Sequence, residues 1–143
     1  MEQIELAISI MFDVHKYKTD LDGKPAMLHS LEVGAMGKTD MEKCVGFLHD
    51  VIEDSDLTAD DILDMGVDDD VVEALKILTH NKEITYLDYI NNILESGNEV
   101  AINVKLNDLK HNLARGIAGG HTKQVEKHSK ALVHMMLELG TVK

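Results

Sequence analysis

Apolar residues recur at helical spacing along most of the chain, and this periodicity constrains the fold more than any other feature. In the first segment, for example, Ile4, Ile8 and Met11 fall on one helical face. Alternating patterns typical of strands are scarce, and the chain has a single proline. Only 3% of the residues are aromatic and none is Trp, so Leu, Ile, Val and Met must fill the core. We therefore predict an all-α protein, a compact bundle of about seven helices.

Turn and capping residues mark where these helices begin and end. A cluster of turn formers over residues 18–25 ends the first helix, and the third helix is expected to run to about Ile52. Thr58 and Asp61 have the spacing of a capping box. Gly116 to Gly120 predict a mobile loop before the last helix. With no internal repeat, low-complexity tract or linker, we expect one domain over residues 1–143.

The charge balance restricts the partners of the protein. The chain has 14 Lys and Arg against 26 Asp and Glu, which gives a net charge of −12. An acidic surface repels nucleic-acid backbones and no basic stripe is present, so we expect no nucleic-acid partner. A small anionic ligand is compatible with this charge, because a bound metal and a few local cations can reverse the field inside one pocket.

The remaining features of composition concern location and assembly. Cys44 is the single cysteine, so no internal disulfide can form. The first residues lack a basic region and a cleavage site, and no apolar run approaches the length of a membrane span, so a cytoplasmic protein without a membrane partner is expected. Met135, Met136 and Leu139 leave a homo-oligomer open, although such residues more often belong to the core.

Several titratable residues occupy positions that the periodicity assigns to the core. His49 and Asp50 follow an apolar stretch, and His29 and Asp108 lie on helices with core-facing stripes. Unpaired polar groups are costly there. Two imidazoles and two carboxylates would make a mixed nitrogen and oxygen site, which suits Mn²⁺, Fe²⁺ or Zn²⁺ better than Ca²⁺.

A simpler interpretation of these residues is also open. Each histidine could be a core residue whose hydrogen bonds are satisfied, and spacing alone does not show that the four side chains converge. The other histidines considered show no partner spacing and are expected to be structural or surface residues: His80, His121, His128 and His134.

Five stretches of the sequence resemble, in order, those of small HD-domain metal-dependent phosphohydrolases. The similarity is to the hydrolase domain of RelA/SpoT-type alarmone enzymes and their small stand-alone relatives. The pairing of a His-Asp-x-x-Glu-Asp stretch with a Lys-Leu-x-Asp-x-x-x-Asn stretch is more specific than either piece alone. The five stretches are His15-Lys16-Tyr17-Lys18, Gly23-Lys24-Pro25 with His29, Leu48 to Asp54, Leu78 to Lys82, and Val104 to Asp108 with His111-Asn112.

This resemblance implies an HD-domain helical bundle with a metal centre. The residues that it assigns to one divalent ion, typically Mn²⁺, are His29, His49, Asp50 and Asp108. Other transition metals are compatible with the same ligands.

The resemblance also implies roles for residues around that centre. Glu53 and Asp54 match the acidic pair that orients or activates the attacking water. Lys18 falls where a basic residue packs on the nucleotide base, and Asn112 matches an Asn that helps to hold the ribose and its phosphates.

The activity implied is removal of the 3′-pyrophosphate from guanosine tetra- or pentaphosphate, which releases GDP and pyrophosphate from the tetraphosphate. Two departures keep a second substrate open. Lys18 stands in place of Arg, and Ala26 stands in place of an aromatic residue. The alternatives are therefore an HD phosphohydrolase for another nucleotide (a nucleotidase or 3′-phosphatase) and a non-catalytic nucleotide-binding HD module. The intact pair Glu53 and Asp54 argues against the last.

Overall fold

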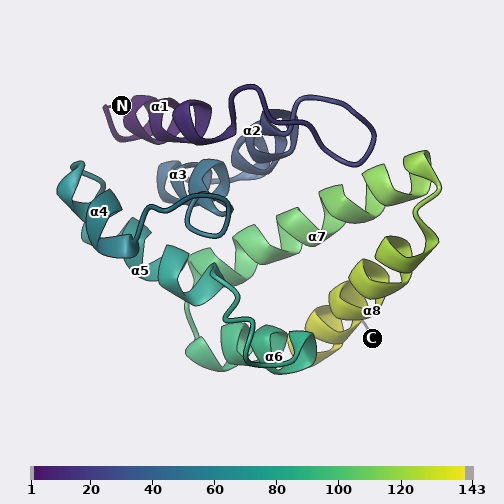
Figure 1. Ribbon diagram of the computed structural model, residues 1–143. Helices are drawn as coiled ribbons and strands as arrows, with labels where there is room; N and C mark the ends of the chain where they lie inside the picture. The colour runs from purple at the N-terminus through teal and green to yellow at the C-terminus, as the bar shows by residue number, and fades with distance from the viewer. Residues whose placement is uncertain (1, 141–143) are drawn as a thin grey trace.

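The computed structural model describes residues 2–140, which form eight α-helices and no β-strand (Figure 1). The all-α prediction is thus confirmed. In chain order the helices are α1 (Glu2–His15), α2 (Met27–Met36), α3 (Asp40–Leu48), α4 (Ala59–Asp64), α5 (Asp69–Leu78), α6 (Tyr86–Ser96), α7 (Glu99–Gly119) and α8 (Thr122–Glu138). Among these residues, none of the helices combines the length and the apolar character that crossing a bilayer requires.

The long helix α7 runs through the middle of the bundle (Figure 1). It contacts α2 and α3 toward the N-terminal half of the chain, and it contacts α5, α6 and α8 toward the C-terminal half. The core between them is aliphatic, as the low aromatic content requires, and includes the fully buried Leu48, Ile90, Leu109 and Met135. Because α7 touches both groups of helices, a residue on it can contribute to a site that either group lines.

Helices α2 and α3 pack closely, and two glycines allow this. A Cβ added to Gly46 would lie 2.8 Å from the backbone of Gly34, and a Cβ added to Gly34 would overlap the ring of Phe47. Side chains at these positions would force the helices apart. The glycines therefore set how closely the two segments that carry His29 and His49 approach each other.

The capping box predicted before α4 is present. The Thr58 side chain accepts a hydrogen bond from the backbone N–H of Asp61, and the Asp61 carboxylate accepts one from the backbone N–H of Thr58. These bonds satisfy two amide groups that have no partner within the helix.

The prediction of a mobile loop over Gly116 to Gly120 is wrong for most of that segment. Helix α7 continues through Gly119 and ends at Gly120, which adopts a left-handed conformation with φ 71°. Gly116 lies within the helix, where a Cβ would approach the Val125 side chain on α8 to 3.2 Å. The glycine therefore permits close packing of α7 against α8, a role that the sequence does not distinguish from that of a loop residue.

Candidate metal centre

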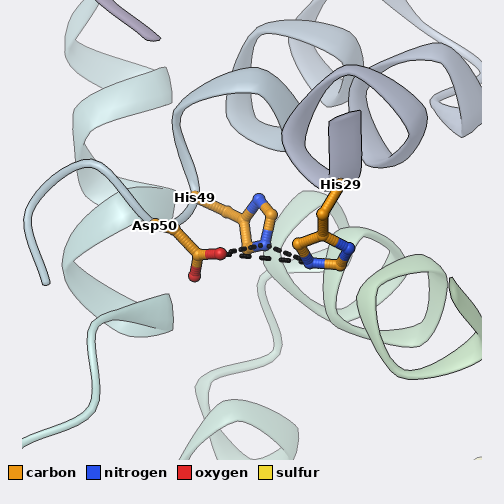
Figure 2. Close-up of side chains that lie close together, drawn as sticks. All are labelled: His29, His49 and Asp50. Atoms are coloured by element: carbon orange, nitrogen blue, oxygen red, sulfur yellow. Dashed lines mark hydrogen bonds and ion pairs between the residues drawn. The ribbon is translucent and has the colours of Figure 1, made fainter. Parts of the chain in front are cut away.

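Side chains from α2 and from the turn after α3 point toward one another (Figure 2). The Nε2 atoms of His29 and His49 are 3.2 Å apart. One carboxylate oxygen of Asp50 lies 3.2 Å from His49 Nε2 and 3.9 Å from His29 Nε2. His29 and His49 are buried and Asp50 is partly buried, so these three side chains form a compact cluster of nitrogen and oxygen donors that could hold a metal ion.

Asp108 adds a second carboxylate from α7. Its Oδ1 atom lies 2.8 Å from His29 Nε2 and 3.2 Å from His49 Nε2, and the side chain is buried. The structure therefore brings together all four residues that the sequence analysis proposed as metal ligands.

The turn after α3 corrects one expectation and explains how neighbouring residues reach one point. The helix was expected to continue to about Ile52, but it ends at Leu48, and residues 49–54 form turns. The imidazole of His49 donates from Nδ1 to the carbonyl oxygen of Gly46, at 2.7 Å, and so binds the carbonyl that residue 50 would use in a longer helix. Asp50 is thereby free to turn its carboxylate toward His49.

The same hydrogen bond shows that the cluster fits a cation. Because Nδ1 of His49 carries the proton that Gly46 accepts, a neutral His49 presents the lone pair of Nε2 to the cluster. That lone pair would face the oxygens of Asp50 and Asp108, both at 3.2 Å. Such an arrangement of acceptors favours a positive charge among them, which either a second proton on His49 or a metal ion can supply.

Burial and the opposite charges within the cluster also shift the pKa values of its residues. Burial tends to lower the pKa of His49, but the carboxylates of Asp50 and Asp108 raise it well above its usual value. Burial tends to raise the pKa of Asp108, but Lys105 and the two histidines hold it well below its usual range. Burial lowers the pKa of His29. Without a metal ion, these shifts favour a protonated His49 beside ionised Asp50 and Asp108 carboxylates.

The cluster borders a pocket of about 150 Å³. His49, Asp50 and Asp108 line one part of it, and the remaining lining includes three lysines, Lys82, Lys105 and Lys127. The chain as a whole is strongly acidic, with a net charge of −12. The pocket therefore combines three ammonium groups with the carboxylates of Asp50, Glu53 and Asp108, in a protein whose overall charge is negative.

Lys105 is the most deeply placed of these lysines. Its side chain is buried, and its ammonium donates to Oδ2 of Asp108 at 2.9 Å. The ammonium also lies 5.1 Å from the ring centroid of Tyr89 and 5.7 Å from that of Tyr86. The Tyr89 hydroxyl in turn donates to the carbonyl oxygen of Leu78. Lys105 thus neutralises one oxygen of Asp108 while the other oxygen faces the histidines.

Of the four remaining residues that the sequence analysis placed in the site, two line the pocket and two do not. Glu53 and Asn112 line the pocket, and Asn112 donates from Nδ2 to Asp108 Oδ1 at 3.0 Å. Glu53 accepts a hydrogen bond of 2.6 Å from the backbone N–H of His80. Asp54 and Lys18 are not among the lining residues of this pocket: the Asp54 carboxylate faces His15, and the Lys18 ammonium donates to the Asp54 carbonyl oxygen at 2.8 Å.

Sequence reasoning missed much of the pocket wall. His80 and His128, which were expected to be structural or surface residues, line the pocket, and so do Tyr86 and Tyr89. Lys105 could have been found, because it precedes Asp108 by three residues on a helix and such pairs share a face. Lys127 and His128 lie on α8 and reach the pocket only through the packing of α8 against α7, for which the sequence carries no signal.

No protein-family model and no curated protein matches this chain.

Proposed function

We propose that this protein is a metal-dependent phosphohydrolase that removes the 3′-pyrophosphate of guanosine tetra- or pentaphosphate. The observation that carries the proposal is the junction of two kinds of site. A cluster of two imidazoles and two carboxylates adjoins a pocket with three lysines. A polyphosphate substrate needs both lysine ammonium groups, which neutralise its charge, and a metal ion, which activates the reacting phosphorus.

The donor set suits Mn²⁺ among the ions considered, and the resemblance to RelA/SpoT-type hydrolases favours the same ion. A divalent ion in this cluster would lower the pKa of a bound water and polarise a phosphoryl oxygen. The residues that would hold it are His29, His49, Asp50 and Asp108.

The surrounding residues would bind the phosphates and accept the proton of the attacking water. Lys82 and Lys127 line the pocket and would neutralise phosphate oxygens there. Glu53 lines the same pocket and is placed to accept a proton from the attacking water. In the reaction, the water oxygen forms a bond to the phosphorus that is attached to the 3′ oxygen. The bond between this phosphorus and the 3′ oxygen breaks, and the 3′ oxygen takes up a proton. The products from guanosine tetraphosphate are GDP and pyrophosphate.

One observation favours a second candidate, a phosphohydrolase for another nucleotide. The contact that would hold guanine in the resemblance involves Lys18, whose ammonium is engaged with the Asp54 carbonyl oxygen. The metal cluster is unaffected by this difference. The second candidate therefore keeps the same ligands and the same attacking water, and it changes the nucleotide that is accepted.

Turnover assays distinguish the candidates. Purified protein is incubated with guanosine tetraphosphate, with and without Mn²⁺, and the products are resolved by anion-exchange chromatography. We expect Mn²⁺-dependent release of GDP and pyrophosphate that is lost in His49→Ala. The matched control is His134→Ala, because His134 pairs with Asn91 at 2.7 Å and is not a lining residue of the pocket.

A panel of other nucleotides in the same assay gives the alternative outcomes. Metal-dependent release of phosphate from a different 3′-phosphorylated nucleotide or a nucleoside monophosphate would support the second candidate. Nucleotide that binds with metal present and is never consumed would contradict both hydrolase proposals and indicate a binding module.

A further inference from the structure

Arg115 is the only arginine in the chain of 143 residues. It lies near the candidate metal centre but does not line the pocket that adjoins the cluster. It is located on α7, one turn beyond Asn112, and its side chain is 37% exposed. Its guanidinium donates twice to one atom, the Oδ1 of Asn112, from Nε at 2.9 Å and from Nη2 at 2.6 Å. Its nearest carboxylate is that of Asp20, at 3.9 Å.

This pair of bonds determines which way the Asn112 amide faces. A guanidinium has only N–H donors, so the atom that it contacts must be the amide oxygen. The amide nitrogen of Asn112 then points the other way and donates to Asp108 Oδ1 at 3.0 Å. With the amide reversed, an oxygen would face an oxygen at Asp108, and the guanidinium would face an NH₂ group.

The oxygen that Asn112 contacts is the one that matters for the cluster. Asp108 Oδ1 is the atom that lies 2.8 Å from His29 Nε2 and 3.2 Å from His49 Nε2. Lys105 holds the other oxygen of the same carboxylate. Asp108 is therefore fixed from two directions, and one of these depends on Arg115.

We propose that Arg115 is a positioning residue for the metal centre: by fixing the Asn112 amide, it orients the Asp108 carboxylate toward His29 and His49. This inference rests on the proposed metal-binding function. Residues that orient a metal ligand without touching the ion typically change metal affinity by about 10–100-fold when they are replaced.

The sign of the effect separates positioning from simple electrostatics. Removing a cation close to a metal site reduces repulsion, so the loss of charge alone would make Arg115→Gln bind Mn²⁺ more tightly. Loss of the orienting bonds would make it bind more weakly. Arg115→Lys keeps the charge but cannot form the two-bond contact, so electrostatics alone predicts no change and positioning predicts weaker binding.

The experiment is a calorimetric titration of Mn²⁺ into the metal-free proteins. We expect the Kd to rise by about tenfold in both Arg115→Gln and Arg115→Lys. Lys110→Gln, a loss of an exposed charge on the same helix, is the control and should leave the Kd within about twofold. Helix content by circular dichroism verifies that each variant is folded.

A double-variant cycle tests the route through Asn112. If Arg115 acts through this amide, Arg115→Gln should have no further effect on the Kd in an Asn112→Leu background. Unchanged or tighter Mn²⁺ binding in folded Arg115→Gln, or full additivity in the cycle, would overturn the inference and leave the proposed function standing. Failure of the wild-type protein to bind Mn²⁺ would instead overturn the metal-centre proposal, and this inference with it.

Discussion

The imidazole of His15 lies 3.1 Å from the carboxylate of Asp54, although 39 residues separate them in the chain. His15 is only 3% exposed, and within residues 2–140 its other ring nitrogen, Nδ1, is buried without a hydrogen-bond partner. A proton on Nδ1 would have no acceptor among these residues, so the ring proton that faces Asp54 lies on Nε2. His15 at the end of α1 therefore donates to Asp54 and fixes the orientation of its carboxylate.

Replacing His15 tests whether this orientation contributes to turnover. The resemblance assigns Asp54 to the pair that orients the attacking water, and on that assignment loss of the donor in His15→Phe should lower kcat by about tenfold, because a positioned acid or base contributes roughly 10²–10⁴-fold. His15→Gln offers an amide N–H in a similar place and should retain most of the activity. Steady-state kinetics on the preferred nucleotide provide the measurement. Equal losses in the two variants, or none in either, would show that the hydrogen bond does not matter for the reaction.

Lys105 is expected to contribute strongly to stability. Lys105→Met keeps much of the side-chain volume but leaves the buried Asp108 carboxylate without its cation, so we expect the metal-free protein to lose about 3 kcal/mol in the free energy of unfolding. Urea denaturation measures the change. Lys110→Met is the control, because Lys110 is exposed on the same helix. Similar unfolding curves for the two variants would contradict the role assigned to the ion pair.

The close contact of α2 and α3 gives a prediction about both stability and metal binding. A Cβ at position 46 would lie 2.8 Å from backbone atoms of α2, and backbone cannot move aside as a flexible side chain can. We expect Gly46→Ala to lose about 1–3 kcal/mol of stability and to bind Mn²⁺ more weakly, because the segments that carry His29 and His49 move apart. Gly116→Ala, whose added Cβ would meet a Val125 methyl group at 3.2 Å, should be the milder substitution. The reverse order of stabilities would count against this explanation.

His128 predicts a specific dependence of stability on pH. Burial lowers its pKa from the ordinary 6.5 to about 4. Between these values the unfolded chain binds a proton at this residue that the folded protein does not, so the free energy of unfolding falls as the pH decreases through this window. His128→Phe removes this contribution and should lose less stability than the wild type between about pH 6.5 and pH 4. Urea midpoints measured with a metal chelator present would test this, and parallel pH profiles would refute it.

Much of the fold could be predicted from the sequence, because helix formation depends on local patterns. The face formed by Ile4, Ile8 and Met11 and the capping box at Thr58 are properties of short segments, and both lie in helices or caps of the structure. The errors arose where tertiary contacts override a local signal. Gly116 reads as a loop residue, yet its place is set by a neighbouring helix.

The candidate ligands could be proposed from the sequence, but their convergence could not. His29 and Asp108 are 79 residues apart, and only the packing of α2 against α7 brings them within 2.8 Å. The sequence also did not predict the end of α3 at Leu48, because this end involves a hydrogen bond from the His49 side chain to the carbonyl oxygen of Gly46. The pocket wall on α8 depends wholly on tertiary packing, so no spacing in the sequence indicated Lys127 or His128.

The most direct test of the metal centre is an anomalous difference map from crystals soaked in Mn²⁺. The account predicts one strong peak between the Nε2 atoms of His29 and His49 and the carboxylates of Asp50 and Asp108, and no peak there in His49→Ala. A strongest peak elsewhere, or an unchanged peak in the variant, would contradict the claim that these four side chains hold the ion.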